Sequence, residues 1–407
     1  MNDLKLSLVF GIFTRVITFL NQILSVPLII TLIGLSEFTR YNVMTAGVAW
    51  LITLGGCLLP SIIGDIARAC LDKDDETISK KVSSAFALMF TFCLIVVLVY
   101  SIFFSTLSID THAILFFSII IIFASTAESI RQGLGENYKN SIYNGIANLL
   151  SLVGIFTLYF LKVKTNLLII LCVTLGSVAF LKLINLLPLL QYFNLRNIKF
   201  NHCKDMLVKA LGFIMISVAY YCNTAGMITI LGYTKYDAIT DFVILQKIIL
   251  IIMGIIVMVR NPLWGVIAKM KYKGGGAEIM NGFNKFLKIY FLFCPIIFIT
   301  LYFGLNPFLA LWAKGLSIDQ LTITFYSLYI LIMMLSYINS ILYYGLEIFS
   351  SVSKLLIIEA VVNIVCVFIL SKTGAPLYII FIVMLCTSLS VSSIVYNLIK
   401  RTCANVN

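Results

Sequence analysis

The sequence predicts an all-α integral membrane protein with about twelve transmembrane helices in two parallel six-helix repeats. First, 61% of the 407 residues are hydrophobic and 11% are charged, whereas a soluble domain carries about 25% charged residues. Second, apolar stretches of membrane-spanning length recur along the whole chain. Third, the two halves of the chain carry a weak internal repeat. A soluble enzyme is therefore close to excluded.

Twelve apolar stretches are separated by short polar breaks, which fits the roughly 20 residues that a membrane-spanning helix needs. The first stretch is too long for the core of a signal peptide and lacks a small-residue cleavage site, so we expect a retained helix. Pro27 removes a backbone hydrogen bond in this helix and allows a kink. The stretches are 6–33, 41–64, 82–104, 113–130, 142–161, 167–190, 210–231, 238–259, 286–304, 321–344, 355–370 and 377–398.

The distribution of Lys and Arg predicts the orientation, because these residues favour the cytoplasmic side of short loops. Placing the N-terminus in the cytoplasm puts twenty of the 29 Lys and Arg residues on the cytoplasmic side and six on the outer side. This asymmetry persists only if every stretch crosses the membrane in alternation. We therefore expect an even number of helices and two cytoplasmic termini.

The internal repeat appears when the halves are slid by 198 residues, which places residues 31–34 (TLIG) on residues 229–232 (TILG). The halves then align as an N-terminal six-helix bundle, residues 1–200, and a C-terminal six-helix bundle, residues 201–407. Both copies have the same orientation. Parallel repeats predict a pseudo-two-fold axis along the membrane normal, with a cavity between the bundles.

Catalytic and cofactor sites find little support in the sequence. The ten cysteines are scattered without a C-x-x-C pair, and neither His112 nor His202 has a partner at motif spacing. A phosphate-binding loop is absent, and no long basic run suggests nucleic-acid binding. We therefore expect no enzyme, no metal site, no cofactor and no nucleic-acid partner.

A polar stripe runs along the first helix at spacings i, i+3, i+7 and i+10, and it comprises Arg15, Thr18, Gln22 and Ser25. Arg15 lies about 14 Å from the inner end of the helix, near the middle of the bilayer. It is either a cation that lines a cavity for an anionic substrate or a structural residue paired with a carboxylate such as Glu359.

Two lysines also lie inside predicted spans. Lys247 has no acidic neighbour at i±3 or i±4, so it either lines an aqueous cavity or loses its proton. Lys182, near Asn185, either extends to the inner interface or faces a cavity. Glu128 and Arg131, spaced i, i+3 at a cytoplasmic helix end, are expected to neutralise each other.

Several uncharged and acidic groups complete the candidate set. Asn223 lies near mid-depth among hydroxyl side chains, which suits either sugar hydroxyls or helix packing. Glu359, spaced i, i+4 from Asn363, is either a proton- or cation-coupling site or an ordinary interfacial carboxylate. The substrate-binding candidates are Arg15, Gln22, Lys182, Asn223 and Lys247, and the ion-coupling candidates are Glu359 and Asp241.

Five segments together resemble the Wzx-type polysaccharide (O-antigen) flippases of the MATE-like multidrug/oligosaccharidyl-lipid/polysaccharide superfamily. The resemblance covers nearly the full length and includes the late proline of the first span. The segments are residues 32–41 (LIGLSEFTRY), 54–56 (LGG), 64–68 (GDIAR), the surroundings of Asn363, and 372–375 (KTGA).

The resemblance implies a transporter that moves undecaprenyl-pyrophosphate-linked oligosaccharide from the inner to the outer leaflet of a bacterial cytoplasmic (inner) membrane. Arg15 and Lys247 would then face the pyrophosphate or acidic sugars. Membrane lipids, a polysaccharide polymerase and a chain-length regulator are the implied partners. The alternative is a MATE-type drug/cation antiporter, which would need buried carboxylates; only Asp241 and Glu359 are candidates.

Overall fold

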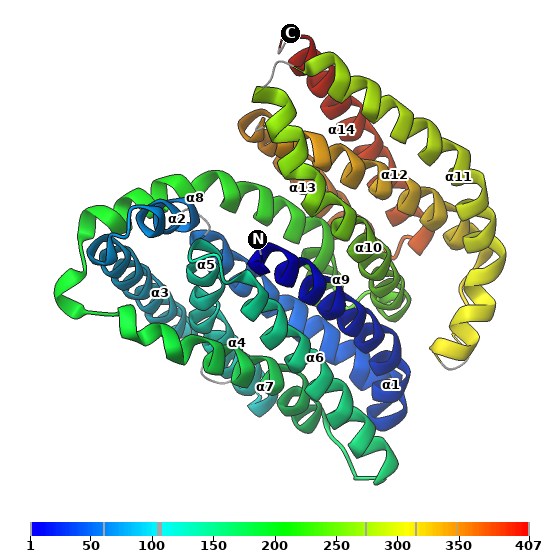
Figure 1. Cartoon of the computed structure of the whole chain (residues 1–407). Helices are drawn as coiled ribbons and strands as arrows, with labels where there is room; N and C mark the ends of the chain where they lie inside the picture. The colour runs from blue at the N-terminus through cyan, green and yellow to red at the C-terminus, as the bar shows by residue number, and fades with distance from the viewer. Residues whose placement is uncertain are drawn as a thin grey trace. The chain divides into compact units, whose positions relative to one another are not determined.

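The computed structural model describes residues 2–59, 62–103, 108–272, 275–313, 316–346 and 348–405. The predicted all-α membrane fold is confirmed, since every regular element among these residues is helical (Figure 1). The first half contains α1 (Asn2–Leu58), α2 (Ile63–Leu71), α3 (Asp75–Phe103), α4 (Ile109–Ala124), α5 (Thr126–Gly133), α6 (Asn137–Phe160), α7 (Leu167–Leu186), η2 (Leu187–Tyr192) and η3 (Leu195–Asn197).

The second half continues with α8 (Phe200–Tyr221), η4 (Cys222–Gly226), α9 (Met227–Tyr233), α10 (Ile239–Tyr272), α11 (Gly276–Trp312), α12 (Gln320–Gly345), α13 (Phe349–Lys372) and α14 (Leu377–Asn405). Among the described residues, ten helical segments are long and apolar enough to cross a membrane. Eleven of the twelve predicted stretches match these segments in order, the first two sharing one segment, whereas the predicted stretch 238–259 lies on α10, which is not among the ten. Their exact number of crossings and their orientation stay predictions.

The chain divides into two compact units, Met1–Tyr221 and Cys222–Asn407. The sequence predicts a division after residue 200, at the start of α8, whereas these two units divide after Tyr221, at the end of α8. Helix α8 packs on α1 and α3, which explains why it clusters with the first unit.

The backbone of α1 leaves helical geometry at Gly34, where φ is 82° and ψ is 164°. A residue with a Cβ atom rarely adopts this conformation, so glycine permits the break between the first two predicted spans. Pro27 lies within the helix before it, and the Thr31 hydroxyl donates a hydrogen bond to the Pro27 carbonyl at 2.6 Å. The break therefore lies at the glycine rather than at the proline.

Helices of the first unit approach one another closely where one of them carries a glycine. A Cβ atom on Gly145 of α6 would lie 3.1 Å from the Thr14 hydroxyl of α1, and these two helices lie side by side in Figure 1. A Cβ atom on Gly133 of α5 would lie 2.8 Å from the Ile66 side chain and 3.1 Å from the Ile63 carbonyl of α2. Such small-residue contacts are a common device of helix packing in membranes.

We expect Gly133→Ala to lower the stability of the protein by about 1–3 kcal/mol, because the added methyl group must displace Ile66 or the backbone of α2. Gly56→Ala is the matched control, since a Cβ atom there would have no neighbouring atom within 4 Å. Alanine's better helix propensity should leave that variant at or above wild-type stability. The measurement is the apparent melting temperature in detergent. Equal melting temperatures of the two variants would contradict the close-contact argument.

Three serines of α3 hold the segment that joins α7 to α8. The Ser79 hydroxyl donates to the Tyr192 carbonyl at 2.9 Å, and the Ser83 hydroxyl accepts from the Asn194 amide at 2.9 Å. The Ser84 hydroxyl accepts from the Lys199 amide at 3.3 Å. These bonds satisfy backbone groups of a segment that forms only short 3-10 turns.

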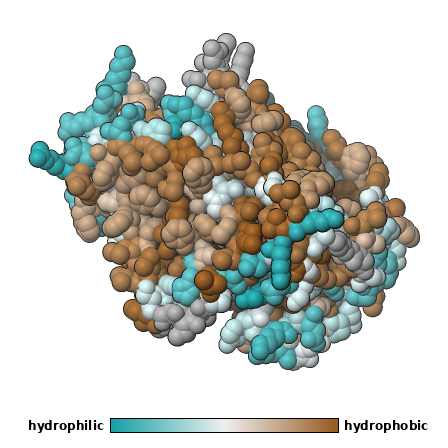
Figure 2. Space-filling view, turned by 90° about the horizontal axis from the view of Figure 1, so that it is seen from below, coloured by the Kyte–Doolittle hydropathy of each residue, from teal (hydrophilic) through white to brown (hydrophobic). Residues whose placement is uncertain are grey.

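The surface of the protein remains strongly apolar, as expected where side chains meet lipid tails. Figure 2 shows broad apolar areas on the visible face. Large exposed side chains include Phe90, Ile102, Leu292 and Leu311, whereas the buried core of the first unit contains Met89, Ile122 and Ile66. Apolar side chains are thus found both in the core and on the surface, as expected of a protein that is surrounded by hydrocarbon.

Aromatic side chains form much of the core of the second unit. Phe381 of α14 stacks on Phe242 of α10 with ring centroids 5.7 Å apart, and Tyr326 of α12 meets Phe381 edge-on at 5.3 Å. The Tyr326 hydroxyl donates to the Leu245 carbonyl at 2.8 Å, which satisfies the only polar atom of this buried side chain. These contacts pack α10, α12 and α14 together.

Candidate functional site

The polar stripe of α1 divides between an exposed face and a packed face. Arg15 and Gln22 are exposed, and Arg15 forms no ion pair with the residues that the structure describes. Thr14 and Thr18 lie on the packed face, where the Thr14 hydroxyl donates to the Ser141 carbonyl of α6 at 2.5 Å. Arg15 therefore has no described ion-pair partner and is available to bind a ligand.

A line of amides, the asparagine track, runs where α1 meets α6 and consists of Asn21, Asn140, Asn144 and Asn148. The last three are spaced by four residues and share one face of α6. Asn21 of α1 donates to the Asn148 side chain at 3.1 Å, and Asn148 donates to the Asn144 carbonyl at 2.9 Å. The track thus joins α1 and α6 by one hydrogen bond between side chains, Asn21 to Asn148.

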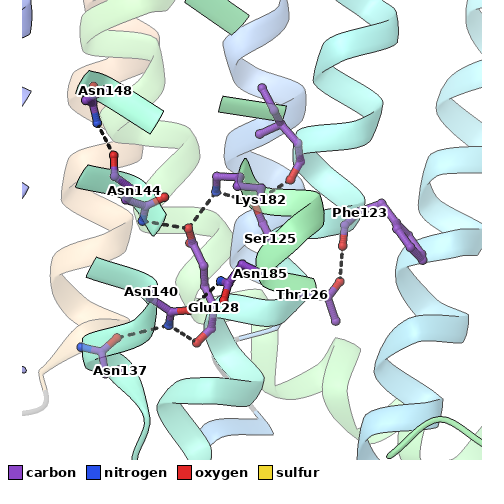
Figure 3. Close-up of polar contacts among 11 residues, drawn as sticks. Phe123, Ser125, Thr126, Glu128, Asn137, Asn140, Asn144, Asn148, Lys182 and Asn185 are labelled. Atoms are coloured by element: carbon purple, nitrogen blue, oxygen red, sulfur yellow. Dashed lines mark hydrogen bonds and ion pairs between the residues drawn. The ribbon is translucent and has the colours of Figure 1, made fainter. Parts of the chain in front are cut away.

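Glu128 and Lys182 form an ion pair beside the asparagine track (Figure 3). The Lys182 ammonium of α7 lies 2.8 Å from Glu128 Oε1 of α5 and donates to the Ser125 hydroxyl, also at 2.8 Å. Asn144 donates to the same Glu128 oxygen at 3.2 Å. The Lys182 side chain is 14% exposed and the Glu128 side chain 36%. This pair can therefore be reached from outside the bundle.

Arg131 lies at the buried end of the same network. Its Nε donates to the Asn185 side chain at 2.5 Å, and Nη2 donates to the Asn185 carbonyl at 3.1 Å. Its Nη1 pairs with Glu136 at 2.6 Å. Asn185 in turn donates to Asn140 of the track at 3.0 Å. Arg131 and Glu128 are thus neutralised by other residues, so the expectation that they pair with each other is wrong.

Lys247 lies on α10 in the second unit, half-buried, and forms no ion pair with any described residue. The preceding residue, Gln246, is only 2% exposed. Neither its amide nitrogen nor its amide oxygen has a hydrogen-bond partner among the described residues. A buried amide without a partner is costly, so this part of α10 has unused capacity for a polar ligand or water.

Asn223 belongs to a buried chain of polar side chains in the second unit. It lies in η4, a π-helical turn, and accepts a hydrogen bond from Asn363 of α13 at 2.9 Å. Asn363 accepts from the Thr387 hydroxyl of α14 at 2.6 Å. One turn before Asn363, Glu359 is 6% exposed and accepts from the Ser388 hydroxyl. π-turns are frequent at functional sites, and here the turn places an amide against α13.

The tertiary structure groups the predicted residues differently from the sequence. Asn223 lies in one buried chain with Asn363, four residues from Glu359, whereas Asp241 lies half-buried in the first turn of α10. Lys182 is paired, whereas Arg15 and Lys247 form no described ion pair. Sequence reasoning missed the asparagine track, although the i, i+4 spacing of its α6 members is visible in the sequence.

Three solved structures that the chain resembles are MOP superfamily transporters. An inward-facing multidrug resistance MATE family transporter has a TM-score of 0.76 and 14% identity, covering 96% of this chain and 95% of that chain. An outward-facing one has a TM-score of 0.63 and 12% identity, covering 99% and 95%. A transporter from Pyrococcus furiosus has a TM-score of 0.61 and 12% identity, covering 99% and 95%; it is described by a reversed binding-pocket polarity that suggests a different function.

No protein-family model matches the sequence, and no curated protein matches it. Sequence identities of 12–14% to the solved structures show the fold alone. The chain is thus a multi-pass helical membrane protein with the fold of the MATE transporters of the MOP superfamily.

Proposed function

We propose that the protein is a flippase for lipid-linked oligosaccharide in the bacterial cytoplasmic membrane. It would carry undecaprenyl-pyrophosphate-linked repeat units from the inner to the outer leaflet. The observation that carries this proposal is the pair of cations inside helices α1 and α10, Arg15 and Lys247. Neither forms an ion pair with a described residue. An unpaired cation within a membrane-spanning helix is a functional candidate by default.

The chemistry of the substrate fits such cations. A pyrophosphate is a polyanion, and moving it through a low-dielectric region is unfavourable without compensating positive charge. A single pair of opposite unit charges 4 Å apart contributes about 4 kcal/mol at an effective dielectric constant of about 20. Arg15 and Lys247 could thus lower the barrier for the head group while the undecaprenyl chain stays in lipid.

A MATE-type drug/cation antiporter is the second candidate, because the solved neighbours include multidrug resistance transporters. A lipophilic cation would need an available carboxylate. Among the described residues, Glu128 is neutralised by Lys182, whereas Glu359 and Asp241 form no ion pair and are the carboxylates that such a cation would use. The neighbour with reversed pocket polarity supports the idea that one fold can take substrates of opposite charge.

Glu359 is the proposed ion-coupling residue, with Asp241 as the second candidate. Its carboxylate lies inside α13, and a hydroxyl rather than a cation is its described partner. We expect Glu359→Gln to remove the dependence of transport on an imposed proton or sodium gradient while substrate binding persists. Asp237→Asn, at an exposed acidic position before α10, is the control. Unchanged gradient dependence in Glu359→Gln would exclude the coupling role.

Proteoliposomes provide the test of the proposed function. A fluorescent undecaprenyl-pyrophosphate oligosaccharide in the outer leaflet is expected to become protected from a membrane-impermeant reductant only when the protein is present. Ethidium uptake into the same vesicles tests the second candidate. Ethidium transport without glycolipid movement would overturn the flippase proposal.

A further inference from the structure

The Glu128–Lys182 pair and the asparagine track form a polar surface that the phosphate-binding proposal does not use. We propose that they are a carbohydrate subsite, which binds hydroxyl and acetamido groups of the sugars while Arg15 binds the phosphate. This inference rests on the proposed function and adds where the glycan is held. It assigns a role to Glu128, Asn144 and Asn21 as well as to Lys182.

The site has both hydrogen-bond donors and hydrogen-bond acceptors without described partners. Glu128 accepts two bonds at Oε1, while Oε2 receives none from the described residues. Lys182 uses two of the three donors of an ammonium group. The side-chain oxygen of Asn21 is buried without a described partner. A sugar hydroxyl donates and accepts at one atom, so it can satisfy neighbouring donors and acceptors together.

The charge of the site distinguishes it from the phosphate candidates. Glu128 and Lys182 neutralise each other at 2.8 Å, so the pair offers no net attraction to a pyrophosphate. It does offer strong, oriented dipoles to uncharged polar groups. Arg15, exposed and without a described ion pair, offers net positive charge. Phosphate and sugar are thus expected to bind different parts of the first unit.

Exposure separates the proposed subsite from its structural support. Glu128 and Lys182 are 36% and 14% exposed, whereas Arg131 and Asn185 are both 2% exposed. All four lie within candidate membrane spans. Glu128 and Lys182 lie toward the span ends that the Lys and Arg distribution places in the cytoplasm, so we expect their accessible side to face water or a polar ligand. The buried side holds the subsite in place.

The subsite is connected to the phosphate candidate through α1. Asn21 is next to Gln22, which shares the exposed stripe with Arg15. Asn21 lies six residues from Arg15, which is roughly 9 Å along a helix. One helix therefore presents a cationic side chain on its exposed face and an amide toward the asparagine track, whose α6 members Asn140, Asn144 and Asn148 appear in Figure 3.

Two lipid probes test this subsite on the purified full-length protein in nanodiscs. They are undecaprenyl pyrophosphate and undecaprenyl-pyrophosphate-linked N-acetylglucosamine. We expect the sugar-bearing probe to bind wild type about tenfold more tightly, which corresponds to 1.4 kcal/mol. Asn144→Ala should abolish this advantage and leave the affinity for undecaprenyl pyrophosphate unchanged. Asn144→Ser, a milder change, should reduce the advantage.

Thr157→Ala is the matched control, because Thr157 is exposed on the same helix, outside the track, and its hydroxyl donates to the Val153 carbonyl of that helix. It should keep the tenfold advantage, whereas Arg15→Ala should weaken both probes equally. Equal binding of the two probes to wild type would overturn the subsite and leave the flippase proposal intact. Binding of neither probe would overturn both.

A cation site is the competing use of the same carboxylate and amide oxygens. Melting temperatures in sodium chloride and in choline chloride separate the two. A drop on removing sodium that occurs in wild type and vanishes in Glu128→Gln would overturn the carbohydrate subsite. Equal melting temperatures in the two salts would support it.

Discussion

Arg15→Ala is expected to reduce surface polysaccharide about tenfold or more in cells that depend on this protein, with the protein still inserted in the membrane. The reason is the loss of a cation without a described ion pair, since one hydrogen bond to a charged group contributes about 1.5–3 kcal/mol. Lys247→Ala should have an effect of the same kind. Arg15→Lys should retain part of the activity if charge alone matters, because lysine keeps the charge but loses the planar donor fork.

The matched control is Arg40→Ala. Arg40 lies on the same helix but is exposed beyond Gly34, where it pairs with Glu37 and Asp110. Its replacement should leave surface polysaccharide close to normal, because exposed ion pairs contribute little. Normal polysaccharide in both Arg15→Ala and Lys247→Ala would remove the proposed role of these cations.

Chemical labelling tests the same two positions independently. Cysteines that replace Arg15 and Lys247 should react with a membrane-impermeant thiol reagent, since the proposal requires both side chains to contact water. The background should lack the exposed native cysteines Cys172 and Cys386. Inertness at both positions would instead indicate a dry environment and argue against binding of a phosphate.

Arg131→Ala is expected to lower stability by about 3 kcal/mol, the largest structural effect that we predict. The guanidinium is buried and donates to both polar groups of Asn185 and to Glu136. Alanine would leave the Asn185 carbonyl and side-chain oxygen without these donors inside the bundle. Thermal unfolding in detergent, followed by intrinsic fluorescence, measures the effect.

Two variants show whether the network itself carries this stability. Arg68→Ala removes an exposed arginine from the last turn of α2 and should change the melting temperature little. Arg131→Lys keeps the charge but cannot reproduce three bonds with fixed geometry, so it should fall between alanine and wild type. A melting temperature of Arg131→Ala equal to that of Arg68→Ala would contradict the structural role.

The fold class followed from the sequence because the signal is local. Each predicted span is a stretch of apolar residues long enough to cross hydrocarbon, and a helix satisfies its own backbone hydrogen bonds there. The break at Gly34 was less predictable. Proline marks a missing donor, but only the position with a positive φ required glycine, and that conformation depends on how the flanking helices pack.

The sequence by itself determined an apolar helical protein with cations inside its spans, since hydropathy and helical periodicity are properties of neighbouring residues. Only the tertiary structure decided which charged and polar side chains meet across the bundle. Lys182 meets Glu128, and Arg131 meets Asn185, each across 54 residues of chain. Such partners are chosen by the packing of α5, α6 and α7, and no spacing along one helix encodes them.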